Sequence, residues 1–225
     1  MDDLSNYFDD LRLRYREAFL ECADAIVSEI LALKPANVSG EIFDNYYDNS
    51  DGKLWQLNVL DLLKNKFLFD IEQGLVEISS LRDSFDCAGC GVCCRLACSE
   101  FSPSELFEKA DNGDNYASQF IRIFVPYNSE DVVKAVFPQY LDMLKNRKEE
   151  GYYFYHCPKV TTDNRCPDYA NRPQICRDFP DNPLAFLPLS CSYKNWKLKA
   201  EPVSLKVNAL SEIVNFYIEN LNKVI

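Results

Sequence analysis

The sequence predicts a mainly α protein, in which a helical hairpin and a C-terminal helix pack around a loop-rich cysteine core with little β structure. Apolar residues recur every three or four positions near both ends of the chain. Between these regions, nine of the ten cysteines lie in positions 87–191, where the periodicity is weak. We therefore expect a helical extension over 1–82, a cysteine-cluster region over 83–200, and a helix over 201–225 that packs on the N-terminal helices.

The length and charge of the chain restrict the kinds of fold and partner that it can have. A chain of 225 residues can bury a core without covalent cross-links. Its 24 lysines and arginines against 35 aspartates and glutamates give a formal charge of -11, which argues against nucleic-acid and anionic-lipid partners. No long apolar window and no export signal are found in the sequence. We expect a cytoplasmic protein with no membrane partner, and a protein partner stays open.

The N-terminal region contains two apolar-periodic runs joined by a polar link. The first run covers 4–33 and ends before Pro35, which cannot continue a helix. The link over 45–52 is rich in residues that form turns and helix caps. The second run extends over about 54–81. These features predict a long helical hairpin, with Cys22 as a core residue on the apolar face of its first helix.

The middle of the chain carries shorter signals. Ser102 followed by Pro103 is typical of a capped helix start. A second helix is expected over about 129–148, although Pro138 lies within it and can kink or break it. The aromatic run 152–155 is the best candidate for a strand.

The last region is periodic again. Its apolar residues are spaced three and four apart, at Val203, Val207, Leu210, Val214, Tyr217, Leu221 and Val224. This spacing fits a coiled-coil dimer or a helix that packs on the N-terminal hairpin, and we favour the second interpretation.

The cysteines carry the clearest chemical signal. In a reducing compartment disulfides are uncommon, and clustered thiols more often bind metal or perform redox chemistry. Cys87, Cys90 and Cys93 follow a C-x2-C-x2-C spacing, and Gly89 and Gly91 let backbone N–H groups approach the thiolates. The same spacing supplies three ligands in ferredoxin-type loops. Cys94 points elsewhere, toward a second metal, a bridging position or the core.

A second group of cysteines follows at wide spacing. Cys157, Cys166, Cys176 and Cys191 must each arrive from a separate loop. The whole pattern, C-x2-C-x2-C-C and later C-x2-Y-x2-R-P-x2-C-R-x-F-P with a last cysteine, closely resembles the YkgJ-like cysteine-cluster family. Members are described as zinc- or iron-chelating or iron–sulfur proteins. The resemblance covers 87–191, under half of the chain.

The resemblance implies a set of eight ligands. They are Cys87, Cys90, Cys93, Cys94, Cys157, Cys166, Cys176 and Cys191. Cys98 is an extra candidate for the last place, although packing at the start of the following helix is favoured for it. Pro167 and Asp168 depart from the family, in which many members have an aliphatic residue before the tyrosine.

Arginines surround the proposed ligands in an otherwise acidic chain. Four thiolates on a divalent ion leave about two negative charges, which are costly to bury without compensation. We assign Arg172 and Arg177 to neutralise the cluster or tie its loops together, and place Tyr169 of the same motif beside them. The alternative is that these arginines are exposed and pair with Asp168 and Asp178. His156, the only histidine, is expected to lie near the site without ligating.

Ligand identity does not distinguish an iron–sulfur cluster from zinc, because both take thiolate shells. The ferredoxin-like spacing favours iron–sulfur, with a redox or metal-handling role. A structural zinc site that stabilises a helical interaction module is the first alternative. An enzyme is the second, because flagellin lysine N-methylases contain a similar cluster, although the sequence shows no methyl-donor site.

Overall fold

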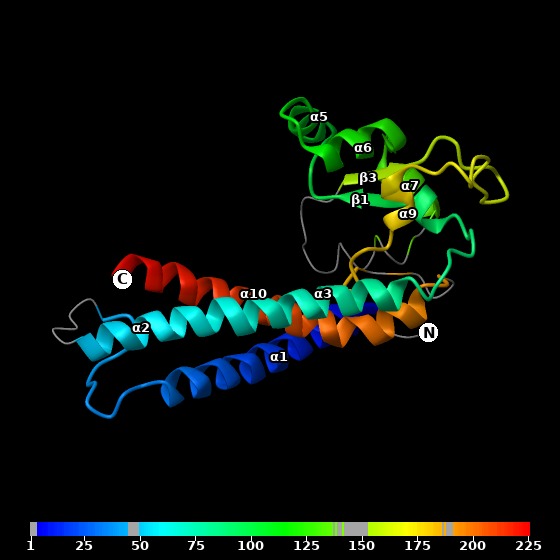
Figure 1. Cartoon of the computed structure of the whole chain (residues 1–225). Coiled ribbons are helices and arrows are strands. Elements are labelled where there is room, and N and C mark those ends of the chain that lie inside the picture. Colours follow the sequence, from blue (N-terminus) through cyan, green and yellow to red (C-terminus); the bar gives the residue numbers. More distant parts are fainter. Residues whose placement is uncertain are drawn as a thin grey trace. The chain divides into compact units, whose positions relative to one another are not determined.

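The computed structural model describes residues 4–44, 50–136, 138, 141, 153–185, 187 and 191–225. It confirms a mainly α protein with a small three-stranded sheet (Figure 1). The chain divides into two compact units. The helical unit comprises Asp9–Phe85 and Asn195–Ile225, and the cysteine unit comprises Met1–Phe8 and Asp86–Lys194. The cysteine unit is therefore inserted in sequence between two segments of the helical unit.

The helical unit is built from long helices. They are α1 (Leu4–Ala32), whose first turn belongs to the cysteine unit, α2 (Ser50–Leu62), α3 (Leu68–Arg82) and α10 (Lys194–Val224). A π-helical turn, η1 (Leu63–Phe67), joins α2 to α3 into one continuous arm. This arm and α1 form the expected hairpin, and α10 lies along it (Figure 1).

The core of this unit takes side chains from α1, α2, η1 and α10. Cys22 is only 3% exposed within it, as expected for a core residue. The buried Trp55 donates its indole N–H to the carbonyl of Ile30 at 3.1 Å, so its one polar group is satisfied. Leu210 and Val214 of α10 are buried in the same core. The C-terminal helix therefore packs on the N-terminal helices, as favoured from its periodicity.

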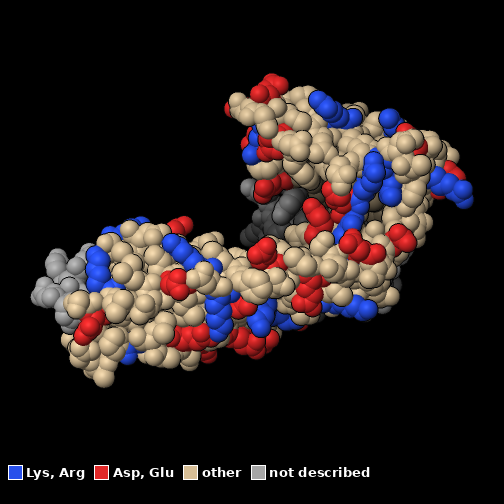
Figure 2. All heavy atoms as spheres, in the orientation of Figure 1, with Lys and Arg blue, Asp and Glu red and all other residues tan. Residues whose placement is uncertain are grey.

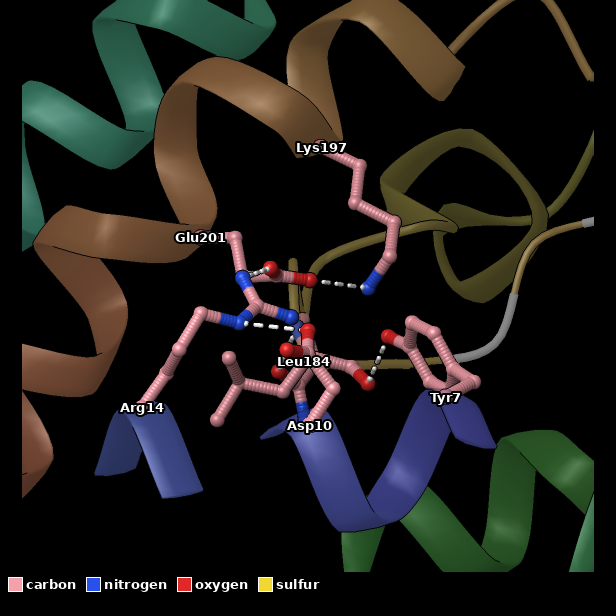
Figure 3. A network of polar contacts seen from close by, with 7 residues as sticks. Tyr7, Asp10, Arg14, Leu184, Lys197 and Glu201 are labelled. Atoms are coloured by element: carbon pink, nitrogen blue, oxygen red, sulfur yellow. Dashed lines mark hydrogen bonds and ion pairs between the residues drawn. The ribbon is translucent and has the colours of Figure 1, made fainter. Parts of the chain in front are cut away.

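The C-terminal helix begins at Lys194, which corrects the start expected at 201. The first two turns were missed because they contain buried charges where the pattern requires apolar residues. Glu201, with a side chain 6% exposed, accepts from Lys197 Nζ at 2.8 Å and also pairs with Arg14 of α1 (Figure 3). Arg14 Nε lies 2.8 Å from Asp10. The two cations offset the cost of burying the carboxylate.

The cysteine unit contains the sheet. Its strands β1 (Ala97–Ser99), β3 (Tyr153–His156) and β2 (Val125–Pro126) are antiparallel in that order. The strand expected over 152–155 runs one residue further, because His156 pairs with Val125. Tyr152 lies outside the described residues.

Short helices flank this sheet. They are α4 (Val92–Arg95), α5 (Pro103–Asp111), α6 (Asn115–Ile123), α7 (Glu130–Val136) and α9 (Gln174–Asp178). The predicted capped start of α5 is confirmed, because Ser102 and Glu105 form a reciprocal capping box. The helix expected over 129–148 is seen as α7, and 137, 139–140 and 142–150 lie outside the described residues. A small core of Leu106, Ala117, Phe120 and Tyr155 joins α5 and α6 to β3.

Candidate metal centre

One cavity of the cysteine unit gathers the thiols. It has a volume of about 820 Å³, and all nine cysteines from Cys87 to Cys191 line it. These nine thiols are partly exposed, whereas Cys22 is buried in the helical core. Cysteine is among the most buried residue types when it serves only as a small apolar side chain. The nine thiols of the cavity therefore differ from Cys22 in their surroundings.

The first three cysteines form a turn with glycine at its bends. Gly89 and Gly91 have φ angles of 68° and 72°, which favour glycine. The Gly89 N–H points to Cys87 Sγ at 3.4 Å, the kind of N–H to sulfur contact that stabilises a thiolate. A Cβ on Gly91 would lie 2.5 Å from the carbonyl oxygen of Asn164. Only glycine lets this turn approach the 161–165 loop so closely.

Cys191 lies beside the start of this turn, although it is distant in sequence. Ser192 Oγ donates to the carbonyl of Asp86 at 2.6 Å and accepts from the N–H of Ala88 at 3.1 Å. Burial raises the pKa of the Cys191 thiol, and the neighbouring Cys90 and Cys87 raise it further. The Ser192 clamp thus brings a fourth thiol to the C-x2-C-x2-C turn.

Cys93 and Cys94 are hydrogen-bonded to each other. This bond is the largest cause of a raised pKa for Cys93 and of a lowered pKa, about 7, for Cys94. In this contact Cys93 is therefore the donor and Cys94 the acceptor. Burial, Cys94, Cys87 and Cys90 also raise the pKa of Cys93, whereas the cations Arg172 and Arg95 lower that of Cys94.

The remaining proposed ligands lie on the side of Cys94. The Cys157 N–H donates to the Cys94 carbonyl at 2.7 Å, which joins the end of β3 to α4. Burial raises the pKa of Cys176 to about 11, and the nearby Cys94, Cys157 and Cys166 raise it further. These thiols therefore share one neighbourhood, although they come from four separate segments.

The motif arginines organise the loops around the cavity. The Arg172 guanidinium carbon lies 3.7 Å from the ring centroid of Tyr169, and its Nε donates to the Tyr169 carbonyl at 3.2 Å. The Tyr169 hydroxyl donates to the Cys87 carbonyl at 2.9 Å. Arg177 Nε donates to the Arg172 carbonyl at 2.6 Å. Tyr169 thus ties this loop to the first cysteine turn, and Arg172 supplies charge near Cys94.

Arg95 has a role that the sequence analysis did not assign. Its side chain donates to the carbonyl of Thr161 at 2.9 Å and bonds Asn164 Oδ1. It therefore fixes the 161–165 loop against α4 and places a cation near Cys94. Its position directly after the cysteine doublet was the available signal.

His156 and Cys98 are near the proposed ligands but lie in strands of the sheet. The His156 ring packs against Tyr127, with ring centroids 4.6 Å apart, and His156 does not line the cavity. Cys98 lines the cavity but lies in β1 opposite Phe154, so a strand fixes its position.

The thiols share a cavity without yet forming a coordination shell. Within the described ranges, no group of three or more His, Cys, Asp or Glu side chains is arranged to hold a metal ion as it stands. Thiolates repel one another, and a bound cation would draw them together. The clustered thiols, the N–H contact to Cys87 and the nearby arginines fit a thiolate-bound metal or cluster.

Comparison with known proteins gives no family assignment. No family model matches the chain, and neither a curated protein nor a solved structure is significantly similar to it. None of the described helices combines the length and apolar character that a membrane span requires. On the visible face of the helical unit, acidic and basic side chains are interspersed (Figure 2). Because no comparison assigns a family, the function is inferred from the cysteine site itself.

Proposed function

We propose that this protein binds a metal centre through its cysteine cluster, preferably an iron–sulfur centre, in a redox or metal-handling role. The observation that carries the proposal is the convergence of nine partly exposed thiols on one cavity. Cysteines with only a packing role would be buried, as Cys22 is in the helical unit. The resemblance of the motif to the YkgJ-like family supports the same chemistry.

The residues proposed to hold the centre are the eight cysteines of the motif. When bound, an iron–sulfur centre supplies one-electron transfer at a potential set by its ligands, hydrogen bonds and exposure. The Gly89 N–H near Cys87 would stabilise a thiolate ligand. Arg172 and Arg95 would offset the negative charge of the thiolates near Cys94. Zinc takes the same ligands and is the competing occupant.

Anaerobic purification with metal and sulfide analysis tests the proposal. We expect iron, acid-labile sulfide and broad visible absorption that is lost in a Cys90→Ser variant. The matched control is Cys22→Ala, which removes a buried thiol far from the cavity in sequence and should keep full metal content. Stoichiometric zinc without iron would contradict the iron–sulfur preference. Absence of any metal, also after reconstitution with iron and sulfide or with zinc, would overturn the proposal.

A further inference from the structure

We propose that the cysteine unit holds two separate four-thiolate centres, which divide between Cys93 and Cys94. This inference rests on the proposed function and specifies its site. The first centre takes Cys87, Cys90, Cys93 and Cys191, and the second takes Cys94, Cys157, Cys166 and Cys176. The cavity of about 820 Å³ is far larger than one metal ion with sulfur atoms about 2.3 Å away.

The first group is defined by the Ser192 clamp. Both hydrogen bonds of Ser192 Oγ go to the backbone immediately around Cys87, at Asp86 and Ala88. Because Ser192 follows Cys191 directly, the clamp fixes Cys191 next to the turn that carries Cys87 and Cys90. Cys87 and Cys90 are close enough to Cys191 to raise the pKa of its thiol, and both also raise the pKa of Cys93. Four thiols thus converge from two segments of the chain.

The second group is defined by the junction of β3 and α4. The Cys157 N–H bonds the Cys94 carbonyl at 2.7 Å, so the two residues are adjacent in space. The pKa of Cys176 in α9 is raised by three nearby thiols, which are those of Cys94, Cys157 and Cys166. The backbone bond between Cys157 and Cys94 therefore anchors a second group of thiols at the end of β3.

The cysteine doublet explains how one turn serves two centres. Cys93 and Cys94 both lie in α4, where successive side chains point about 100° apart around the helix axis. One helix turn can therefore present Cys93 to the first group and Cys94 to the second. The hydrogen bond between the two thiols shows that the proposed centres are neighbours. Arg172 and Arg95 lower the pKa of Cys94, so their positive charges lie near the second proposed centre.

Titration of reduced, metal-free protein with Co²⁺ counts the centres independently of iron–sulfur assembly. We expect two Co²⁺ per chain, each with the absorption of a tetrahedral four-thiolate site. Cys191→Ser and Cys176→Ser should each retain one such site, and the double variant should retain none. Cys98→Ser is the matched control within the same cavity and should keep both sites.

The outcomes separate this inference from the proposed function. One tight Co²⁺ per wild-type chain, or loss of both sites in either single variant that keeps wild-type circular dichroism, overturns the two-centre arrangement but leaves metal binding intact. Absence of thiolate-bound Co²⁺ in the wild type overturns both. If a single variant fails to fold, the wild-type stoichiometry decides, since one equivalent rejects the inference and two equivalents support it.

Discussion

The helical unit and the cysteine unit are ordered by different means. In the helical unit, long helices bury a continuous apolar core, and its buried tryptophans have hydrogen-bond partners. In the cysteine unit, the described core cluster is small, and single hydrogen bonds such as Tyr169 to Cys87 join its loops. We therefore expect the helical unit to be stabilised by its own packing, and the cysteine unit to depend on what its thiols bind.

Metal removal should produce the largest difference between the two units. Structural zinc contributes about 10–16 kcal/mol to folding of small thiolate domains, and a comparable contribution here would exceed what the small core supplies. We expect a chelator under reducing conditions to abolish amide-exchange protection in 153–185 and to leave protection in α2 and α10. Metal-loaded protein is the control. Equal loss of protection in both units would show that they do not differ in this way.

Truncation of the buried Trp196 should destabilise the helical unit and leave the metal content of the cysteine unit unchanged. Its side chain is fully buried, and its indole N–H donates to the carbonyl of Ile78 at 3.2 Å. We expect Trp196→Ala to lower the free energy of unfolding of the helical unit by about 3–5 kcal/mol, measured by urea denaturation, with unchanged metal content.

The matched control for this change is Leu198→Ala on the same helix. Leu198 is 62% exposed, so its truncation should change the unfolding free energy by less than about 0.5 kcal/mol. If Trp196→Ala instead released the metal while the helical unit stayed stable, the two units would not be separately stabilised.

The buried carboxylate of Glu201 should give a smaller, pH-dependent effect. Burial acts to raise its pKa, but hydrogen bonds from Lys197 and Arg14 outweigh burial, and the net pKa is lowered from 4.5. This contribution is therefore present above pH 4.5 and is lost as the pH falls through the lower, folded value. We expect Glu201→Gln to cost about 1–3 kcal/mol at pH 7, because Lys197 and Arg14 each lose one charged partner.

Thermal unfolding as a function of pH measures this contribution. The difference between wild type and Glu201→Gln should shrink as the pH falls below 4.5. Glu219→Gln, on the exposed face of the same helix, is the control and should not change the pH profile. A difference that is constant with pH would show that Glu201 acts by packing alone.

Loss of the Tyr169 hydroxyl should have the smallest effect. Tyr169→Phe removes the 2.9 Å bond to the Cys87 carbonyl, and we expect metal affinity to weaken by about 0.5–1.5 kcal/mol, up to roughly tenfold. Competition with a chromophoric chelator measures it. Tyr153→Phe, an exposed tyrosine of the same unit, is the control. Unchanged affinity would mean that this bond does not hold the two loops together in the loaded protein.

Periodicity predicted the long helices of the helical unit, apart from the first two turns of α10, because their buried residues follow one helix face. It gave no sign of the π-helical η1, since both Leu63 and Phe67 remain buried within an apparently continuous pattern. The helix α6 was also missed, although Asp114 caps its start by accepting from the Ala117 N–H. A capping residue alone is too common in loops to define a helix.

Spacing in the sequence singled out cysteines that the structure places around one cavity, but it did not show which of them lie near one another. The C-x2-C-x2-C turn is local, so the pattern contains its geometry. The proximity of Cys191 to Cys87 depends on Ser192, more than a hundred residues away from Asp86, and no local pattern encodes this contact. The stabilising role of Arg95 likewise depends on the loop that contains Thr161.

The insertion of the cysteine unit between α3 and α10 determines the order in which the protein can assemble during synthesis. Translation proceeds at about 5–20 residues per second, so the interval between the emergence of α3 and α10 is on the order of ten seconds. During this interval the apolar faces that Leu210 and Val214 will cover have no partner from α10. The thiols, in contrast, have all been synthesised by the time α10 emerges. The ribosome therefore delivers every cysteine of the cavity before it delivers the last helix of the helical unit.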